Sequence, residues 1–281
     1  MTVAPRPEWK PSTIDGIFTI SNRHFVDRPN LLLLHGALGD SARLTPLVAG
    51  LGGVNLALCD LRGHGRSQAA SAGYDLRTLA HDLLGPVDAI FGDEPIAVFG
   101  ESLGGLVGLS LAQQRPSVAT VILCDTPFDM RRVAPSHAAL MTAYRTQPER
   151  RPVLRSLCRD VFGLDVVSGT VVDRRHHALA FRCPARIVMM TGERKAARDP
   201  GAAEPGAYFD STEHAALAIG MTDVLGVHTI AGGGHRLSKT HPAELARLIL
   251  DELADVPEAA GSQPIVAKPA ISEAAAEPAA P

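Results

Sequence analysis

A serine between two glycines is the residue of this chain best placed to do covalent chemistry. Residues 96–99 form a short β-branched and aromatic run, Gly100-Glu-Ser-Leu-Gly104 follows directly, and an apolar, helix-like run comes next. A Gly-x-Ser-x-Gly pattern between a strand and a helix is the context in which a sharp turn exposes a serine hydroxyl. Gly100 and Gly104 leave room where a Cβ would collide with neighbouring backbone. We therefore predict that Ser102 is a nucleophile; the simpler alternative is a glycine-rich turn.

An acyl-transfer site also needs a base, a group that orients the base, and N–H donors for the oxyanion. The N–H of Leu103 would be free to donate, because the first N–H groups of a helix have no partner within it. A second donor is expected from the loop His35-Gly36-Ala37, which follows the strand predicted at 31–34. We choose Ala37 for this role, and the alternative is a plain turn between a strand and a helix.

The base must be a histidine near the carboxyl end of a strand, and the chain has eleven histidines. His235 follows the strand predicted at 227–230, and the glycines before it would let the imidazole return over the nucleophile. His64 lies in a Gly-His-Gly-Arg turn after another strand, where a turn-stabilising role is the simpler explanation. We expect His176 and His177 to be solvated. His235 is therefore the predicted base.

Strand-like runs alternate with helical patterns along most of the chain. Strands are predicted at 16–20, 31–34, 56–59, 96–99, 120–124, 187–190 and 227–230. The later runs lack period-two alternation, as expected when helices cover both faces of a parallel sheet. An apolar face over 76–87 predicts a helix that Pro86 ends or kinks, and 242–253 predict a last helix. The pattern indicates an α/β fold with a mostly parallel sheet flanked by helices.

Two segments interrupt this alternation. Residues 127–184 are far longer than a strand-to-helix loop requires, so we expect an inserted helical cap there. Residues 256–281 contain nine alanines and five prolines and no aromatic residue, which predicts a disordered tail. The predicted organisation is therefore one domain over residues 1–255, with the cap inside it, followed by the tail.

Four motifs, in order along the chain, together resemble those of the α/β-hydrolase fold superfamily. They are His35-Gly-Ala-Leu-Gly39, Asp60-Leu-Arg-Gly-His-Gly-Arg-Ser67, Gly100-Glu-Ser-Leu-Gly104 and Gly234-His235 before a terminal helix. The likeness runs from about residue 15 to 254. It implies a serine hydrolase of the esterase or thioesterase kind, with the order Ser–acid–His, a cap over the pocket, and no metal or organic cofactor.

The acid is where this sequence departs from the family pattern. Members commonly place it three residues after a glycine that follows the penultimate strand, and Lys195 occupies that position here. Asp125 follows the strand at 120–124, which is the other strand end from which some members supply the acid. Asp199 could be the usual acid displaced by a four-residue insertion, and Glu193 is a third candidate. We choose Asp125 and leave the other two open.

The overall composition limits the partners and the compartment. A formal net charge of −3 and a pI near 6.4 argue against a nucleic-acid or anionic-membrane partner. The four cysteines lie far apart without a Cys-x-x-Cys pair, so neither a zinc site nor a disulfide framework is expected. The N-terminus has no apolar core of signal-peptide length, which predicts a cytoplasmic protein.

The predicted cap carries a charge signal. From Arg131 to Arg186 there are eleven arginines and four carboxylates, a local balance of +7, so the rest of the chain carries −10. The simpler explanation is a solvated basic face. The sharper hypothesis is that these arginines attract an anionic or carrier-bound acyl substrate, or an acidic partner.

The motifs together predict hydrolysis of a small carboxylic ester or thioester through an acyl-enzyme. Carbon–carbon bond hydrolysis and cofactor-free haloperoxidation or perhydrolysis use the same triad and stay open as alternatives. A non-catalytic homologue that binds a ligand or a partner is a further alternative, which the unusual position of the acid favours.

Overall fold

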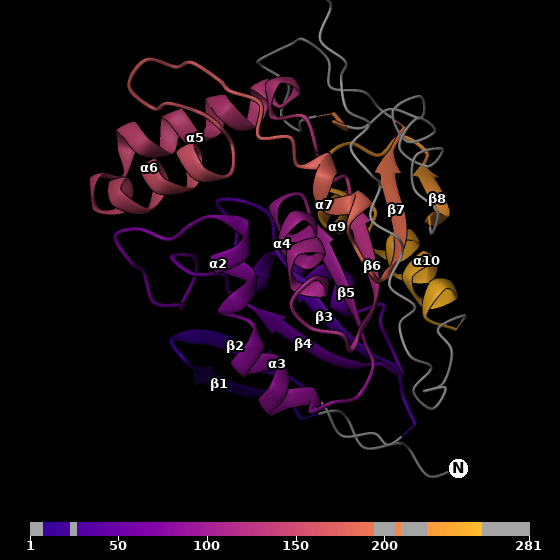
Figure 1. Ribbon diagram of the computed structural model, residues 1–281. Coiled ribbons are helices and arrows are strands. Elements are labelled where there is room, and N and C mark those ends of the chain that lie inside the picture. The colour runs from indigo at the N-terminus through magenta and orange to yellow at the C-terminus, as the bar shows by residue number, and fades with distance from the viewer. Residues whose placement is uncertain (1–7, 23–26, 194–205, 209–223, 255–281) are drawn as a thin grey trace, which may run out of the picture.

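Eight strands form one sheet in the computed structural model, which describes residues 8–22, 27–193, 206–208 and 224–254 (Figure 1). The strands are β1 (Lys10–Ile14), β2 (Ile17–Ser21), β3 (Asn30–Leu34), β4 (Asn55–Cys59), β5 (Ile96–Glu101), β6 (Val118–Cys124), β7 (Arg186–Gly192) and β8 (Val224–Ile230). Their order across the sheet is β1-β2-β4-β3-β5-β6-β7-β8. The pairs from β4 to β8 are parallel, and the edge pairs β1–β2 and β2–β4 are antiparallel. The α/β fold with a mostly parallel sheet is therefore confirmed.

The edge strand β1 is absent from the strands predicted from the sequence. Its residues are mostly exposed, so they carry no apolar pattern that would mark a strand. Asp15 and Gly16 connect it to β2 with positive φ angles of 50° and 78°, which are the angles a tight hairpin turn requires. The Asp-Gly pair was therefore the available signal for this hairpin.

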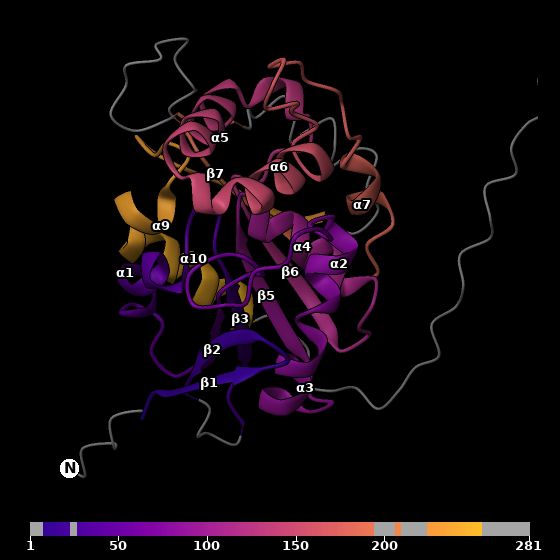
Figure 2. The same cartoon turned by 90° about the vertical axis from the view of Figure 1, so that its left-hand side faces the viewer.

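Helices cover both faces of the sheet, and Figure 2 shows the two layers on opposite sides. One layer contains α2 (Leu76–His81), α3 (Leu84–Phe91) and α4 (Leu103–Ala112), and the other contains α1 (Thr45–Val48), α9 (Leu237–Thr240) and α10 (Pro242–Ala254). Alternate residues of β3 enter different cores: Leu32 and Leu34 pack with the first layer, and Leu31 and Leu33 with the second. This two-sided burial explains why β3 reads as a continuous apolar run.

The helix predicted over 76–87 is two helices, so its predicted end at Pro86 is wrong. The break lies at Asp82 and Leu83, and Pro86 belongs to the first turn of α3. Proline is tolerated there because the first N–H groups of a helix have no partner within it.

The segment between β6 and β7 contains α5 (Ala134–Thr146) and α6 (Arg151–Asp160), which lie beyond the carboxyl end of the sheet, and α7 (His177–Phe181), which packs against α4 (Figure 1). We call these three helices and their connections the cap. Short 3₁₀ turns are found at Ser41–Leu44, Met130–Arg132 and Pro148–Arg150. The expected exposure of His176 is wrong: its side chain is buried, and its Nε2 lies 2.7 Å from the Val161 carbonyl oxygen.

The four cysteines are free thiols in the structure. Cys59, Cys124 and Cys158 are buried free thiols, and Cys183 is half-buried. The tail predicted at 256–281 lies outside the described residues. Within the described ranges, no helix is both long enough and apolar enough to cross a membrane.

Candidate active site

Ser102 occupies a strained turn between β5 and α4. It caps the N-terminus of α4 with a φ of 54°, a conformation that non-glycine residues rarely adopt. The turn is tightly packed: a Cβ on Gly100 would lie 2.2 Å from the Gly104 carbonyl carbon, and one on Gly104 would lie 2.4 Å from the Leu34 carbonyl oxygen. Only glycine fits at these two positions, which explains the pattern around the serine.

The ends of β5 and β6 hold Ser102 and Asp125 side by side. The N–H of Ser102 donates to the carbonyl of Cys124 at 2.9 Å, and the N–H of Asp125 donates to the carbonyl of Met190 at 2.7 Å. The parallel ladder therefore continues one residue past each strand. Asp125 also has a positive φ, of 40°. Two neighbouring strand ends thus carry polar residues in strained conformations, which is typical of functional sites.

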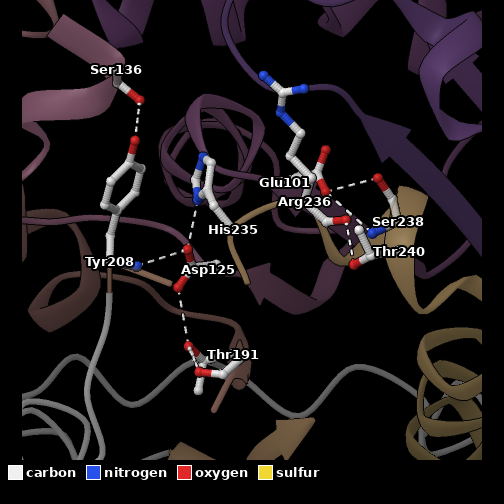
Figure 3. A network of polar contacts seen from close by, with 10 residues as sticks. Glu101, Asp125, Ser136, Thr191, Tyr208, His235, Arg236, Ser238 and Thr240 are labelled. Atoms are coloured by element: carbon white, nitrogen blue, oxygen red, sulfur yellow. Dashed lines mark hydrogen bonds and ion pairs between the residues drawn. The ribbon is translucent and has the colours of Figure 1, made fainter. Parts of the chain in front are cut away.

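Asp125 and His235 form a buried hydrogen-bonded pair (Figure 3). The Nδ1 of His235 lies 2.5 Å from one carboxylate oxygen of Asp125. The same oxygen accepts from the N–H of Tyr208 at 3.0 Å, and the other accepts from the hydroxyl of Thr191 at 3.0 Å. Because an ionised carboxylate only accepts, this contact requires the proton on Nδ1, and in a neutral imidazole with that tautomer the lone pair lies on Nε2. This is the tautomer that a general base needs.

Of the two other candidate acids, Glu193 lies within the described residues and Asp199 does not. Glu193 accepts a hydrogen bond from the N–H of Gly232 at 3.0 Å, so its carboxylate is engaged with the loop that precedes the histidine. Asp199 and Lys195 lie outside the described residues. Among the described candidates, Asp125 is the one hydrogen-bonded to His235.

The loop after β3 lies against the serine. A Cβ built on Gly36 would contact the Cβ of Ser102 at 3.4 Å. Ala37 follows in a turn closed by a hydrogen bond of 3.1 Å from the N–H of Gly39 to the carbonyl of Gly36, and Leu38 in that turn has a φ of 59°. These contacts give the setting for the predicted donors Ala37 and Leu103, and their role stays a prediction.

His35 holds this loop against the turn that follows β4. Its Nε2 accepts from the N–H of Leu61 at 3.0 Å, so its Nδ1 carries the proton that is donated to the Gly36 carbonyl oxygen at 2.8 Å. Burial lowers the pKa of His35, which keeps the ring neutral as this arrangement requires.

The turn from Asp60 to Ser67 has a structural role. The carboxylate of Asp60 accepts from the N–H groups of Ser41 at 2.7 Å and Arg66 at 2.8 Å. Burial alone would raise the pKa of Asp60, but these hydrogen bonds outweigh it and the pKa is lowered overall. His64 lies in the same turn with its Nδ1 3.0 Å from the Arg62 carbonyl oxygen, and burial lowers the pKa of His64 to about 3. A buried, neutral His64 fits the turn-stabilising interpretation.

Two residues beside the predicted acid and base, Glu101 and Tyr208, are not marked by the sequence motifs. Glu101 is buried next to Ser102, and its carboxylate accepts from the hydroxyl of Ser238 at 2.7 Å and from its N–H at 3.3 Å. Burial raises the pKa of Glu101. An ionisable residue at the end of an apolar strand was the available signal. Tyr208 contacts both members of the Asp125–His235 pair, and no motif marks it.

Within the described ranges, no group of three or more His, Cys, Asp or Glu side chains is arranged to hold a metal ion.

Known proteins similar to this chain share its fold over most of its length. A family model described as the alpha/beta hydrolase fold matches residues 29–170. A protein of Variovorax paradoxus (strain S110), whose name describes a carbamate hydrolase (RutD), is 30% identical over 260 residues, covering 82% of this chain and 93% of that protein. The structure of an M. tuberculosis esterase is 21% identical with a TM-score of 0.63, covering 90% of this chain and 93% of that one. A thermophilic esterase of Thermogutta terrifontis is 19% identical with a TM-score of 0.62, covering 88% of this chain and 99% of that one.

The two solved structures are too distant in sequence to carry more than the fold. The family model, by contrast, matches half of the chain and includes the serine turn, and the Variovorax protein aligns with most of both sequences. The chain belongs to the α/β-hydrolase fold family.

Proposed function

We propose that this hydrolase cleaves a small carboxylic ester or thioester through an acyl-enzyme on Ser102. The observation that carries the proposal is the buried hydrogen bond between Asp125 and His235 at the strand end beside Ser102. A serine, a histidine and a carboxylate that orients the histidine are the parts of a nucleophilic triad. Their order along this chain is that of the α/β-hydrolases.

The proposed reaction uses each group once in acylation and again in deacylation. The hydroxyl oxygen of Ser102 attacks the carbonyl carbon while Nε2 of His235 takes its proton. The N–H groups of Ala37 and Leu103 stabilise the oxyanion of the tetrahedral intermediate. His235 then returns the proton to the leaving alcohol or thiol as the carbon–heteroatom bond breaks. Water, deprotonated by His235, attacks the acyl-enzyme and releases the carboxylic acid and free Ser102.

The nature of the leaving group is the open part of this proposal. Esters and thioesters both present a carbonyl carbon to the nucleophile, and so does a carbamate, which the name of the Variovorax relative mentions. Carbon–carbon bond hydrolysis and perhydrolysis would start from the same three side chains. The side chains that surround the acyl and leaving groups, rather than the triad, set this choice.

A pocket between the cap helices α5 and α6 and residues 71–72 supports an anionic substrate. It measures about 480 Å³ and is lined by Arg151, Arg155 and Arg159, together with Ser71, Tyr144 and Ser156. The three arginines share the exposed face of α6, because residues four apart lie on the same side of a helix. Arg159 is ion-paired with Asp160, so the guanidinium groups of Arg151 and Arg155 would supply the attraction for a carboxylate or phosphate carried by the acyl substrate.

The experiment is a substrate panel combined with trapping of the acyl-enzyme. Purified protein is assayed with short- and long-chain p-nitrophenyl esters, acyl thioesters and a carbamate, and quenched samples are analysed by intact mass and peptide mapping. We expect turnover of an ester or thioester and an acyl mass on Ser102. The Ser102→Ala variant serves as the matched control. Turnover without an acyl group on Ser102, or equal turnover by Ser102→Ala, would contradict the proposal.

A further inference from the structure

Tyr208 touches the acid, the base and the cap at the same time (Figure 3). Its main-chain N–H donates to the Asp125 oxygen that also faces His235, at 3.0 Å. Its ring packs against the imidazole of His235, with the ring centroids 4.2 Å apart and the planes tilted by 51°. Its hydroxyl lies 2.8 Å from the hydroxyl of Ser136 in the first turn of α5.

The contact with the Tyr208 ring restrains the His235 imidazole in a way that the hydrogen bond to Asp125 alone does not. His235 follows three glycines, so its backbone is only weakly restricted before the loop folds. The hydrogen bond to Asp125 fixes the position of Nδ1, but the imidazole can still swing about that bond. The ring of Tyr208 lies against the imidazole and limits this swing, and both side chains are buried. The direction of the Nε2 lone pair therefore depends on this tyrosine.

The hydroxyl contact supplies the link to the cap. Ser136 and Tyr208 are 72 residues apart, on α5 and in the short described segment 206–208. Burial raises the pKa of the Tyr208 phenol, so it stays protonated at neutral pH and can share a hydrogen bond with Ser136. A displacement of α5 would have to break this hydrogen bond or pull on the ring that packs against His235.

We propose that Tyr208 is a positioning residue, whose ring orients the His235 imidazole and whose hydroxyl ties that orientation to cap helix α5. The inference rests on the serine-hydrolase function proposed above. It assigns two separable effects to one side chain. The ring acts on the chemical step, and the hydroxyl acts on how the cap closes over a substrate.

The test separates these effects with three variants that all keep the main-chain N–H to Asp125. Tyr208→Leu removes the ring and should lower kcat for a neutral p-nitrophenyl ester about 10- to 100-fold, because small errors in the orientation of a base are costly. Tyr208→Phe should restore kcat to within about twofold of the wild type, because it restores the ring. Tyr208→Phe and Ser136→Ala should each raise KM by the same small factor. Their double variant should raise KM no further, because both remove one shared hydrogen bond.

Controls distinguish positioning from general damage to the fold. Tyr74→Phe removes another buried tyrosine hydroxyl, which bonds to the main chain of Ala70, and should leave kcat and KM unchanged. Melting curves establish whether each variant is folded. A folded Tyr208→Leu with the wild-type kcat, or additive KM effects of Tyr208→Phe and Ser136→Ala, would overturn the inference.

If Tyr208→Leu does not fold, the Phe and Ala variants still decide the role of the hydroxyl. The rate of labelling by a fluorophosphonate separates this inference from the proposed function. If the wild-type protein does not react with the fluorophosphonate, the proposed function is contradicted. If the wild type and Tyr208→Leu react at the same rate, only the inference about Tyr208 is contradicted.

Discussion

Two residues on which the proposed chemistry depends, Ser102 and Asp125, have positive φ angles, as does Leu38 in the loop beside the serine. Ser102, Asp125 and Leu38 have φ angles of 54°, 40° and 59°, and they lie on three loops that meet at the carboxyl end of the sheet. Each such conformation costs about 1–3 kcal/mol for a non-glycine residue, so it persists only where the surrounding structure enforces it. Here the enforcing contacts are the strand-end hydrogen bonds and the close backbone packing of the glycines.

The candidates Ser102 and His235 could be chosen from the sequence because short local patterns mark them, a strand followed by Gly-x-Ser-x-Gly and a strand followed by glycines. The acid could only be narrowed to three carboxylates, because its identity depends on which side chain reaches His235 in space. Tyr208 could not be found at all. Its partners Asp125 and Ser136 are 83 and 72 residues away, and nothing in the local sequence refers to them.

The choice of acid predicts a large kinetic effect of an isosteric substitution. Asp125→Asn keeps the size of the side chain but removes the charge that orients His235, so kcat should fall about 10³- to 10⁴-fold. Glu193→Gln is the matched control and should stay within about twofold of the wild type, because that carboxylate contacts Gly232. Steady-state kinetics on one ester measures both. Loss of activity in Asp199→Asn but not in Asp125→Asn would overturn the choice.

The buried carboxyl of Glu101 predicts a pH-dependent stability. Because its pKa is raised by burial, the folded protein holds this proton more tightly than the unfolded chain does. The stabilisation from the protonated form is present below the unfolded value of about 4.3 and is lost as pH rises through the folded pKa. Glu101→Gln imitates the protonated form and should be more stable than the wild type at neutral pH, with the gap closing toward pH ~4.

Urea unfolding at several pH values tests this expectation, with the exposed Glu244→Gln as the control. A gap between Glu101→Gln and the wild type that stays constant with pH would show that the carboxyl is not responsible.

At the scale of elements, buried strands were predictable and exposed or interrupted elements were not. Every predicted strand is found, and most carry an apolar run that the two layers of helices bury; the edge strand β8 buries Ile230 while Val227 is exposed. β1 was missed because an exposed edge strand needs no apolar residues. The helix over 76–87 was predicted as one because its apolar face continues across the break at Asp82 and Leu83. Apolar periodicity indicates which face of a helix is buried, but it does not indicate where the helix breaks.

The close packing of the serine turn predicts that a side chain at Gly104 is destabilising, whereas one at Gly52 is tolerated. A Cβ on Gly104 would meet the backbone of Leu34 and His35 at 2.4–2.9 Å, and backbone atoms there cannot move without disturbing β3. Gly104→Ala should therefore lower the free energy of unfolding by about 1–3 kcal/mol and reduce activity as well. Gly52→Ala is the control, since nothing lies within 4 Å of its Cβ position. Equal denaturation midpoints for the two variants would contradict this account of the turn.

At the scale of the whole molecule, charge is unevenly distributed. The chain has a net charge of −3, yet residues 131–186 carry +7. Part of that charge is neutralised by carboxylates outside the segment, through ion pairs of Arg131 with Asp129 and of Arg186 with Glu252. Arg155, which lines the pocket on α6, donates a hydrogen bond of 2.7 Å to the hydroxyl of Tyr144. An unevenly charged surface of this kind attracts anions over a range that salt shortens.

This distribution predicts a substrate-dependent salt effect. For an ester that carries a carboxylate or phosphate, kcat/KM should fall steeply with added salt, whereas a neutral ester should show a flat response. Arg155→Gln should lower kcat/KM for the anionic ester at low salt and have no effect at about 0.5 M salt, where screening is nearly complete. Arg247→Gln removes one charge from α10 on the other side of the sheet and is the control. A flat salt response for the anionic ester would rule out steering by the cap.

The central claim is that Ser102 is a nucleophile activated by His235, and covalent labelling tests it most directly without knowledge of the substrate. The folded protein is treated with a fluorophosphonate, and the modified residue is identified by peptide mass mapping, beside the His235→Ala variant. We predict stoichiometric labelling of Ser102 in the wild type and a labelling rate lower by orders of magnitude in His235→Ala. No labelling of the folded wild type, or equal labelling rates in the two proteins, would contradict the claim.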